Sequence, residues 1–185
     1  TRVDDIHLDN GQVTGLTLSN GEKLETRHVV LAVGHSARDT FKMIHDKGIY
    51  VEAKPFSVGF RIEHKQSMID ECRFGDNAGN PILGSADYKL VHHCNNGRTV
   101  YSFCMCPGGF IVPAATANGE VVVNGMSPSR RNNKFANSGI IVEINADKDL
   151  HKYEQFGALK ALEFQKDLEK LAFTAGNRDQ TAPAQ

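Results

Sequence analysis

One stretch of this sequence constrains the fold more than any other. Residues 29–33 form an apolar run that ends in Gly34, and Ser36 with Asp39 has the spacing of a helix capping box. A short apolar run of this kind is typical of a strand buried on both faces of a sheet. The stretch therefore predicts a strand, a turn and a helix, and the N-terminus of that helix suits a phosphate or a dinucleotide.

The residues before this stretch carry two hairpin signals. Asn10-Gly11 and Asn20-Gly21 separate short segments in which apolar and polar residues alternate. Asn-Gly favours a tight hairpin because both residues can adopt positive φ. Residues 3–34 are therefore predicted to form a β-meander that leads into the buried strand.

The remaining residues predict a β-rich region with flanking helices, so the fold class is α+β. A second capping box, Ser67 with Asp70, is expected to open a short helix. In residues 56–62 apolar and polar residues alternate, which places Arg61 away from the apolar face. The other expected strands are 49–51, 89–94, 99–105, 110–113, 121–124 and 140–144, and the other expected helices follow Ser36 and cover about 152–175.

Composition excludes several classes of protein. Charged residues make up 23% of the chain and the net charge is -1, so nothing indicates a nucleic-acid partner. The sequence shows no signal peptide and no membrane-length apolar run, which favours a cytoplasmic protein without membrane contact. The four cysteines in 185 residues are expected to be reduced thiols. Because the chain starts at Thr1 and ends in Pro-Ala-Gln, it is expected to be a fragment.

The most reactive cluster is Cys104-Met105-Cys106. On a strand the two thiols would share a face, where they can bind a soft metal or act as a redox pair. His92, His93 and Cys94 would complete a zinc site, but the Cys-x-x-Cys spacing of structural zinc sites is missing. Packing as small apolar side chains explains these cysteines as well, and no metal site is assigned.

Three further features have both a functional and a structural interpretation. Pro107-Gly108-Gly109 can bring backbone N–H groups close to a ligand or can simply form a hairpin turn. Arg130 and Arg131 can bind a carboxylate or phosphate, or can be solvated surface residues. No motif of a hydrolase or phosphoryl-transfer enzyme occurs, and neither does the Gly-x-Gly-x-x-Gly dinucleotide fingerprint.

Four stretches taken together resemble one family. They are residues 29–39 (VVLAVGHSARD), 54–64 (KPFSVGFRIEH), 104–109 (CMCPGG) and 182–185 (APAQ). The sequence resembles the bacterial NAD(FAD)-utilising dehydrogenases, which are uncharacterised FAD-dependent flavoproteins. This family is related to a wider two-domain flavoprotein group that includes proteins similar to glutathione reductase.

The resemblance implies a domain organisation in which the FAD-binding domain is split along the sequence. Residues 1–34 would be its meander and second FAD strand, residues 35–180 an inserted substrate domain, and residues 181–185 a linker that returns to the FAD domain. The implied cofactor-binding residues are Ala32, Val33, Gly34, His35 and Ser36. Val33 stands where the wider group has threonine, so this contact would be made by backbone atoms.

The resemblance also implies a function. The full-length protein would be an FAD-dependent oxidoreductase, with NAD(P) as a candidate second cofactor, and this fragment would be inactive and would not retain FAD. Its partners would be the missing N- and C-terminal parts of its own FAD domain and an unidentified small-molecule substrate. Cys104 and Cys106 are the candidate catalytic residues, and Arg130 and Arg131 the candidate substrate-binding residues. The alternatives are a non-catalytic binding or interaction module and a Cys/His metal site.

Overall fold

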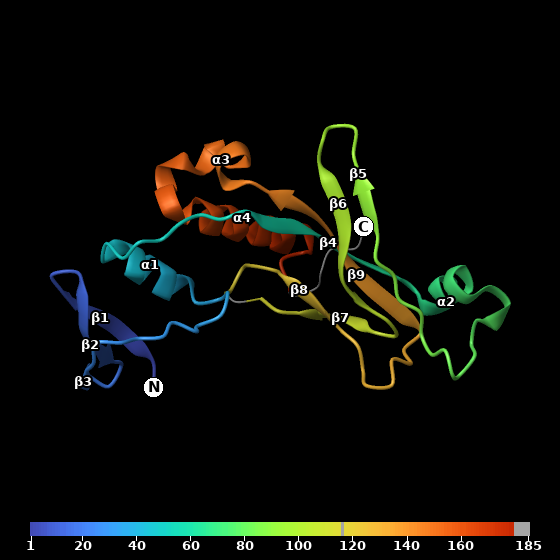
Figure 1. Cartoon of the computed structure of the whole chain (residues 1–185), viewed down its shortest axis with the longest axis horizontal. Coiled ribbons are helices and arrows are strands. Elements are labelled where there is room, and N and C mark those ends of the chain that lie inside the picture. The colour runs from blue at the N-terminus through green and yellow to red at the C-terminus, as the bar shows by residue number, and fades with distance from the viewer. Residues whose placement is uncertain (116, 180–185) are drawn as a thin grey trace. The chain divides into compact units, whose positions relative to one another are not determined.

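The computed structural model describes residues 1–115 and 117–179 (Figure 1). Two compact units make up the chain, one covering Thr1–Glu52 and one beginning at Ala53. The predicted domain ranges 1–34 and 35–180 remain predictions, and the predicted linker at residues 181–185 lies outside the described residues. No helix in the described part of the chain is long and apolar enough to cross a membrane.

The first unit begins with the predicted meander. Strands β1 (Val3–Asp9), β2 (Gln12–Leu18) and β3 (Lys23–Glu25) form one antiparallel sheet in that order. Asn10 and Gly11 both have positive φ, 49° and 78°, as a tight hairpin requires. The two Asn-Gly signals therefore predicted this part of the fold correctly.

The strand predicted at residues 29–33 is wrong. These residues have no regular secondary structure, and Val30 is 90% exposed. A strand buried on both faces needs hydrogen-bonding neighbours, and the part of the chain that the structure describes supplies none for this segment. The predicted strand at 49–51 is also not formed.

Helix α1 (Arg38–Asp46) forms where a helix was expected after Ser36, and Gly48 follows it with a φ of 75°. The capping box is wrong, because the N-cap residue is Ala37 and no side chain caps the helix. Lys47 joins this helix end to β1 through a 2.7 Å ion pair with Asp5.

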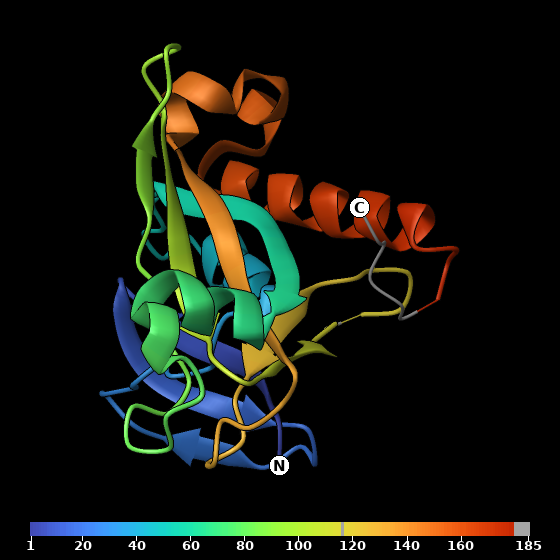
Figure 2. The same ribbon diagram turned by 90° about the vertical axis from the view of Figure 1, so that its right-hand side faces the viewer.

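The second unit is built on an antiparallel four-stranded sheet, which confirms the α+β class. Its order is β4-β9-β6-β5, and the bounds are β4 Phe56–Lys65, β9 Phe135–Ile144, β6 Thr99–Cys106 and β5 Val91–His93. A separate hairpin pairs β7 (Phe110–Pro113) with β8 (Val123–Met126). Figure 2 shows the four strands of the main sheet side by side.

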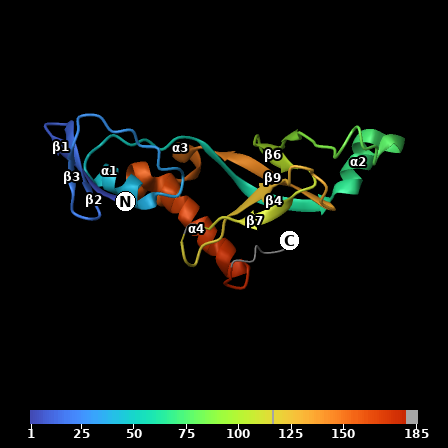
Figure 3. The same ribbon diagram turned by 90° about the horizontal axis from the view of Figure 1, so that it is seen from below.

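Helices lie at both ends of the long strand β4. Helix α2 (Gln66–Phe74) and the 3-10 turn η1 (Gly75–Asn77) follow its C-terminal end, whereas α3 (Ala146–Asp149), η2 (His151–Leu159) and α4 (Lys160–Ala175) lie toward its start (Figure 3). The helix predicted over 152–175 begins only at Lys160, because Gly157 has a φ of 53° and interrupts the turn before it. The predicted second capping box is also wrong, since no side chain caps α2.

The core of this unit covers only half of β4. Leu150, Ala146 and Ile144 are buried and pack with Phe56 and with the helix residue Phe164. Phe60 and Ile62 lie on the same face of β4 as Phe56 but are 70% and 48% exposed. The alternation therefore predicted the strand and its two faces, but the buried cluster includes Phe56 and Val58 and not Phe60 or Ile62.

A partly exposed ion pair between Arg98 and Asp149 gives the second unit a pH dependence. The Nη1 and Nη2 atoms of Arg98 both donate to the Asp149 carboxylate. This carboxylate also accepts from the backbone N–H of Asn145 at 2.8 Å. These donors, the Arg98 side chain first, hold the pKa of Asp149 below its usual range. The resulting stabilisation is complete above the unfolded-state pKa and is lost as pH falls through the lower folded-state value.

We expect Asp149→Asn to flatten the acid side of the stability profile. Urea midpoints of the wild-type chain should fall between about pH 4 and pH 2, and the variant should lose much of that fall. Asp167→Asn is the control, since Asp167 is a carboxylate of the same unit that accepts a hydrogen bond from the Tyr153 hydroxyl at 3.0 Å, whereas Arg98 bonds to Asp149. An unchanged acid slope in Asp149→Asn would show that the pair does not stabilise the fold.

Candidate functional site

The segment 87–90 crosses the sheet surface between α2 and β6, and Tyr88 lies at its centre. The Tyr88 hydroxyl is 2.8 Å from His64 Nε2, and the two rings are 5.5 Å apart. Burial raises the pKa of Tyr88, while Ser138 and the positive charge of Arg61 act in the opposite direction. Tyr88 is therefore a neutral phenol near neutral pH, able to donate or accept a hydrogen bond but not to act as a base.

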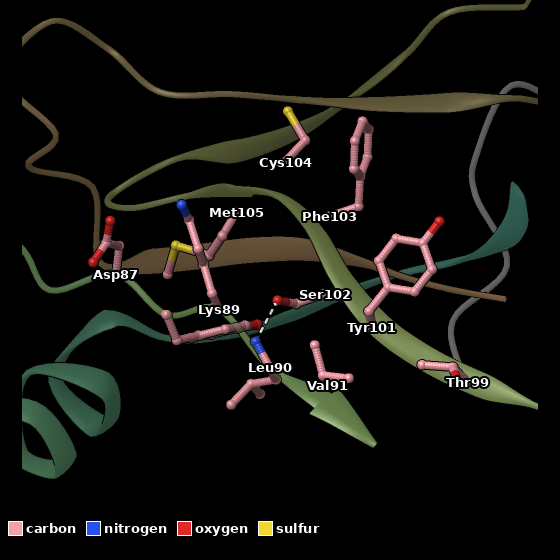
Figure 4. A pocket seen from close by; sticks show the side chains of 11 residues that line it. Asp87, Lys89, Leu90, Val91, Thr99, Tyr101, Ser102, Phe103, Cys104 and Met105 are labelled. Carbon is pink, nitrogen blue, oxygen red and sulfur yellow. Dashed lines mark hydrogen bonds between the residues drawn. The ribbon is translucent and has the colours of Figure 1, made fainter. Parts of the chain in front are cut away.

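A groove of about 510 Å³ lies on one side of this segment (Figure 4). Its walls combine apolar side chains with a few polar groups: Asp87, Tyr88, Lys89, Leu90, Val91, Thr99, Tyr101, Ser102, Phe103, Cys104 and Met105. Figure 4 shows the hydrogen bond that fixes the segment, in which the Leu90 N–H donates to Ser102 Oγ at 2.8 Å.

A second groove of about 820 Å³ shares the same segment and extends toward α2. It is lined by Ile62, His64, Met68, Ile69, Cys72, Arg73, Asp87, Tyr88, Lys89, Leu90 and Ile140. The exposed Ile62 of β4 is thus part of a groove wall. Apolar walls with a small number of polar groups are the usual lining of a small-molecule site.

The two candidate catalytic thiols do not share a face. A register shift interrupts the pairing of β6 with β9 between Phe103 and Cys106, and Cys104 takes a φ of 48°. Cys104 is consequently exposed, whereas Cys106 is 6% exposed and its thiol donates to the Cys104 carbonyl at 3.3 Å. The expectation of a paired dithiol on one strand face is wrong, because a bulge breaks the alternation on which it depended.

A partly buried polar cluster lies beside this bulge. Arg61 Nη1 donates to Asn137 Oδ1 at 2.6 Å and to the Cys104 carbonyl at 3.2 Å, and it lies 3.8 Å from Cys106 Sγ. Asn137 is fully buried, and its Nδ2 has no hydrogen-bond partner among the described residues. Gly125 of β8 packs against the guanidinium, where a Cβ would overlap Arg61 Nη1 and Asn137 Oδ1.

The predicted substrate-binding arginines lie elsewhere. Arg130 and Arg131 are exposed in the loop before β9, and no side-chain contact within the described part of the chain fixes either guanidinium. The backbone of Arg131 holds this loop to another segment, since its carbonyl accepts a hydrogen bond from Ser85 Oγ at 2.6 Å. Their predicted role in binding a substrate stays a prediction.

The Pro107-Gly108-Gly109 turn is a junction inside the fold. The Gly108 N–H donates to Oε1 of the buried Gln66 at 2.7 Å, and Asn133 Nδ2 donates to the Gly109 carbonyl at 2.9 Å. Gln66 Nε2 in turn bonds to Asp70 at 2.8 Å, so Asp70 serves this junction and not a helix cap. The Gly108 N–H is therefore used internally, which favours the structural interpretation of this turn.

The predicted cofactor residues do not form a phosphate-binding corner by themselves. Ala32, Val33, Gly34, His35 and Ser36 have no flanking strand, and the Ser36 hydroxyl bonds to the neighbouring His35 ring at 3.2 Å. A dinucleotide corner requires a strand whose end meets a helix N-terminus. These residues alone do not fit FAD, and their role in binding it remains a prediction.

The Cys/His metal site is not assembled. No group of three or more His, Cys, Asp or Glu side chains in residues 1–115 and 117–179 is placed to hold a metal ion. His93 instead bonds through Nδ1 to Thr99 Oγ1 at 2.9 Å across the β5–β6 hairpin.

Sequence reasoning missed Tyr88, His64 and Asn137 as site residues. Only Arg61 carried a signal, because strand alternation placed it opposite the apolar face. The others come together through the pairing of β4 with β9 and the return of residues 87–90, which short-range patterns do not encode.

A family model described as "FAD-dependent protein, C-terminal domain-like" matches residues 55–185, which is more than half of the chain. The chain belongs to this family. As part of an FAD-dependent protein, it agrees with the flavoprotein resemblance of its sequence. The residues that match this family begin close to Ala53, where the second compact unit begins.

The chain is also similar to a longer protein. An uncharacterized protein of Clostridium beijerinckii is 37% identical over 186 residues, which cover 100% of this chain and 34% of that protein. The chain thus spans about a third of the relative's length. The link to the glutathione-reductase-like group and the use of NAD(P) stay predictions.

Proposed function

We propose that the unit beginning at Ala53 is the substrate-side domain of an FAD-dependent oxidoreductase, where it shapes the pocket over a flavin held by the rest of the protein. The pair of grooves around Tyr88 carries this proposal. They lie in the residues that match the FAD-dependent family, and their apolar walls with few polar groups suit a small organic molecule.

The residues of the grooves have distinct parts in this proposal. Tyr88 offers a neutral hydroxyl to a bound molecule, and the hydrogen bond between this hydroxyl and His64 Nε2 fixes the orientation of the hydroxyl. Leu90 and Ile62 exclude water from an apolar substrate. The redox chemistry belongs to the flavin, and no step through it is assigned to a side chain of this chain.

The proposal includes partners for the first unit. Val30, Leu31 and Val33 are 90%, 46% and 45% exposed, which is unusual for a continuous apolar run. In the complete protein, the N- and C-terminal parts of the FAD domain would cover residues 29–33. The cofactor contact of residues 32–36 would form only then.

An FAD titration tests whether the flavin is held by the rest of the protein and not by this chain. We expect the full-length protein to bind FAD with saturable quenching of flavin fluorescence, and this chain to show no saturation over the same range. Retention of stoichiometric FAD by this chain alone would overturn the proposal. A full-length protein without FAD affinity would also overturn it and would favour a non-catalytic binding module.

A further inference from the structure

Arg61 is a half-buried cation without a counter-charge. Within the described residues no carboxylate lies at ion-pair distance from its guanidinium, whereas Arg98 and Lys160 each bond to acidic side chains. Partial burial of a positive charge costs free energy unless an anion or several hydrogen bonds compensate. The compensation seen here comes only from neutral groups.

The contacts of Arg61 fix one side of the guanidinium and leave the other open. Among the described residues, the hydrogen bonds of the guanidinium all use Nη1, which donates to Asn137 Oδ1, the Cys104 carbonyl and Cys106 Sγ. Nε and Nη2 have no protein acceptor, and neither belongs to the fully buried unpartnered atoms of the described residues. These two nitrogens form the planar edge with which arginine binds both oxygens of a carboxylate or phosphate.

We propose that Arg61 is an oxyanion anchor whose Nε and Nη2 edge binds a carboxylate or phosphate group of a small molecule. The neighbouring Asn137 Nδ2 is a second donor without an acceptor, so the cluster has an excess of donors that suits an anion. Arg61 lines neither groove and lies on the opposite face of β4 from Ile62, so this binding is separate from the proposed function.

The cluster also explains the glycine at position 125. A Cβ there would overlap the guanidinium and the Asn137 side-chain oxygen. Since the end of an arginine side chain can move, Gly125→Ala should fold but should displace the anchor.

NMR resonances of the arginine Nε–H groups test directly whether an anion binds at Arg61. The wild-type chain, without FAD, is titrated with inorganic phosphate and separately with succinate at constant ionic strength. We expect a saturable shift of the Arg61 Nε–H resonance with at least one of them, and the stronger response identifies the anion class. Shifts that grow linearly, or that are equal at Arg61, Arg130 and Arg131, would overturn the anchor.

Variants supply the second arm of the test. Arg61→Gln is expected to weaken anion binding by about tenfold or more, and Arg61→Lys to restore it only in part because the planar edge is lost. Gly125→Ala should weaken binding and also lower the urea midpoint, because the buried Asn137 oxygen must shift together with the guanidinium. The double variant Arg130→Gln, Arg131→Gln is the matched control and should bind like the wild type.

The anion-binding test and the FAD titration can fail independently of each other. Anion binding that survives Arg61→Gln, or that is lost in the loop double variant, would overturn the anchor whatever the FAD result. If Arg61→Gln does not fold, the resonance of the wild-type Arg61 decides alone. An FAD result that contradicts the proposed function would leave a saturable shift at Arg61 in place.

Discussion

Replacing Gly108 by alanine is expected to destabilise the second unit by about 3 kcal/mol or more. Gly108 has a φ of 49°, a conformation that costs an alanine about 1 kcal/mol. In addition, a Cβ at this position would overlap the carbonyl group of Arg131 and come within 2.8 Å of the Asn132 nitrogen. Because these are backbone atoms, they cannot move aside cheaply, and the Gln66 hydrogen bond would be strained as well.

Gly97→Ala is the matched control for this variant. Gly97 has a φ of 81° in the β5–β6 turn, but nothing lies within 4 Å of the position its Cβ would take. It should therefore lose only about 1 kcal/mol. The measurement is the free energy of unfolding from urea titrations of both variants. Equal losses at Gly108 and Gly97 would show that conformation alone matters and that the junction has room for a side chain.

Sequence patterns predicted the local elements of the fold but not the contacts between distant strands. Asn-Gly pairs and alternation predicted the meander, β4, β7 and most of β5 and β6, because these signals are local. The same alternation misjudged Cys104 and Cys106, since a bulge depends on how β6 pairs with the distant β9. Capping boxes failed at both expected sites because the side-chain oxygens found other partners or none.

The candidate site was harder to predict from the sequence than the fold. Arg130 and Arg131 were attractive as neighbouring cations, yet proximity in sequence does not orient a guanidinium. Arg61 is oriented by groups far along the chain, the Asn137 amide and the Cys104 carbonyl. Such a site depends on strand register, which becomes visible only when β4, β9 and β6 are assembled.

Leu150→Ala should be the second strongly destabilising variant, with a loss of about 2–5 kcal/mol. Leu150 is 1% exposed and packs in the cluster that joins the sheet end to α4. Removing its side chain leaves a cavity, because the surrounding backbone of α3 and η2 can collapse only in part. That loss is a large share of the stability of a typical domain.

Leu171→Ala is the control, since Leu171 is a leucine of helix α4 that is 65% exposed. It should change the free energy of unfolding by about 0.5 kcal/mol or less. The Leu150 cluster packs against Phe56, at the opposite end of β4 from His64. Under conditions in which Leu150→Ala is still folded, the Arg61 resonance should therefore respond to anions as in the wild type. A loss of both stability and anion response would show that the two ends of β4 are coupled.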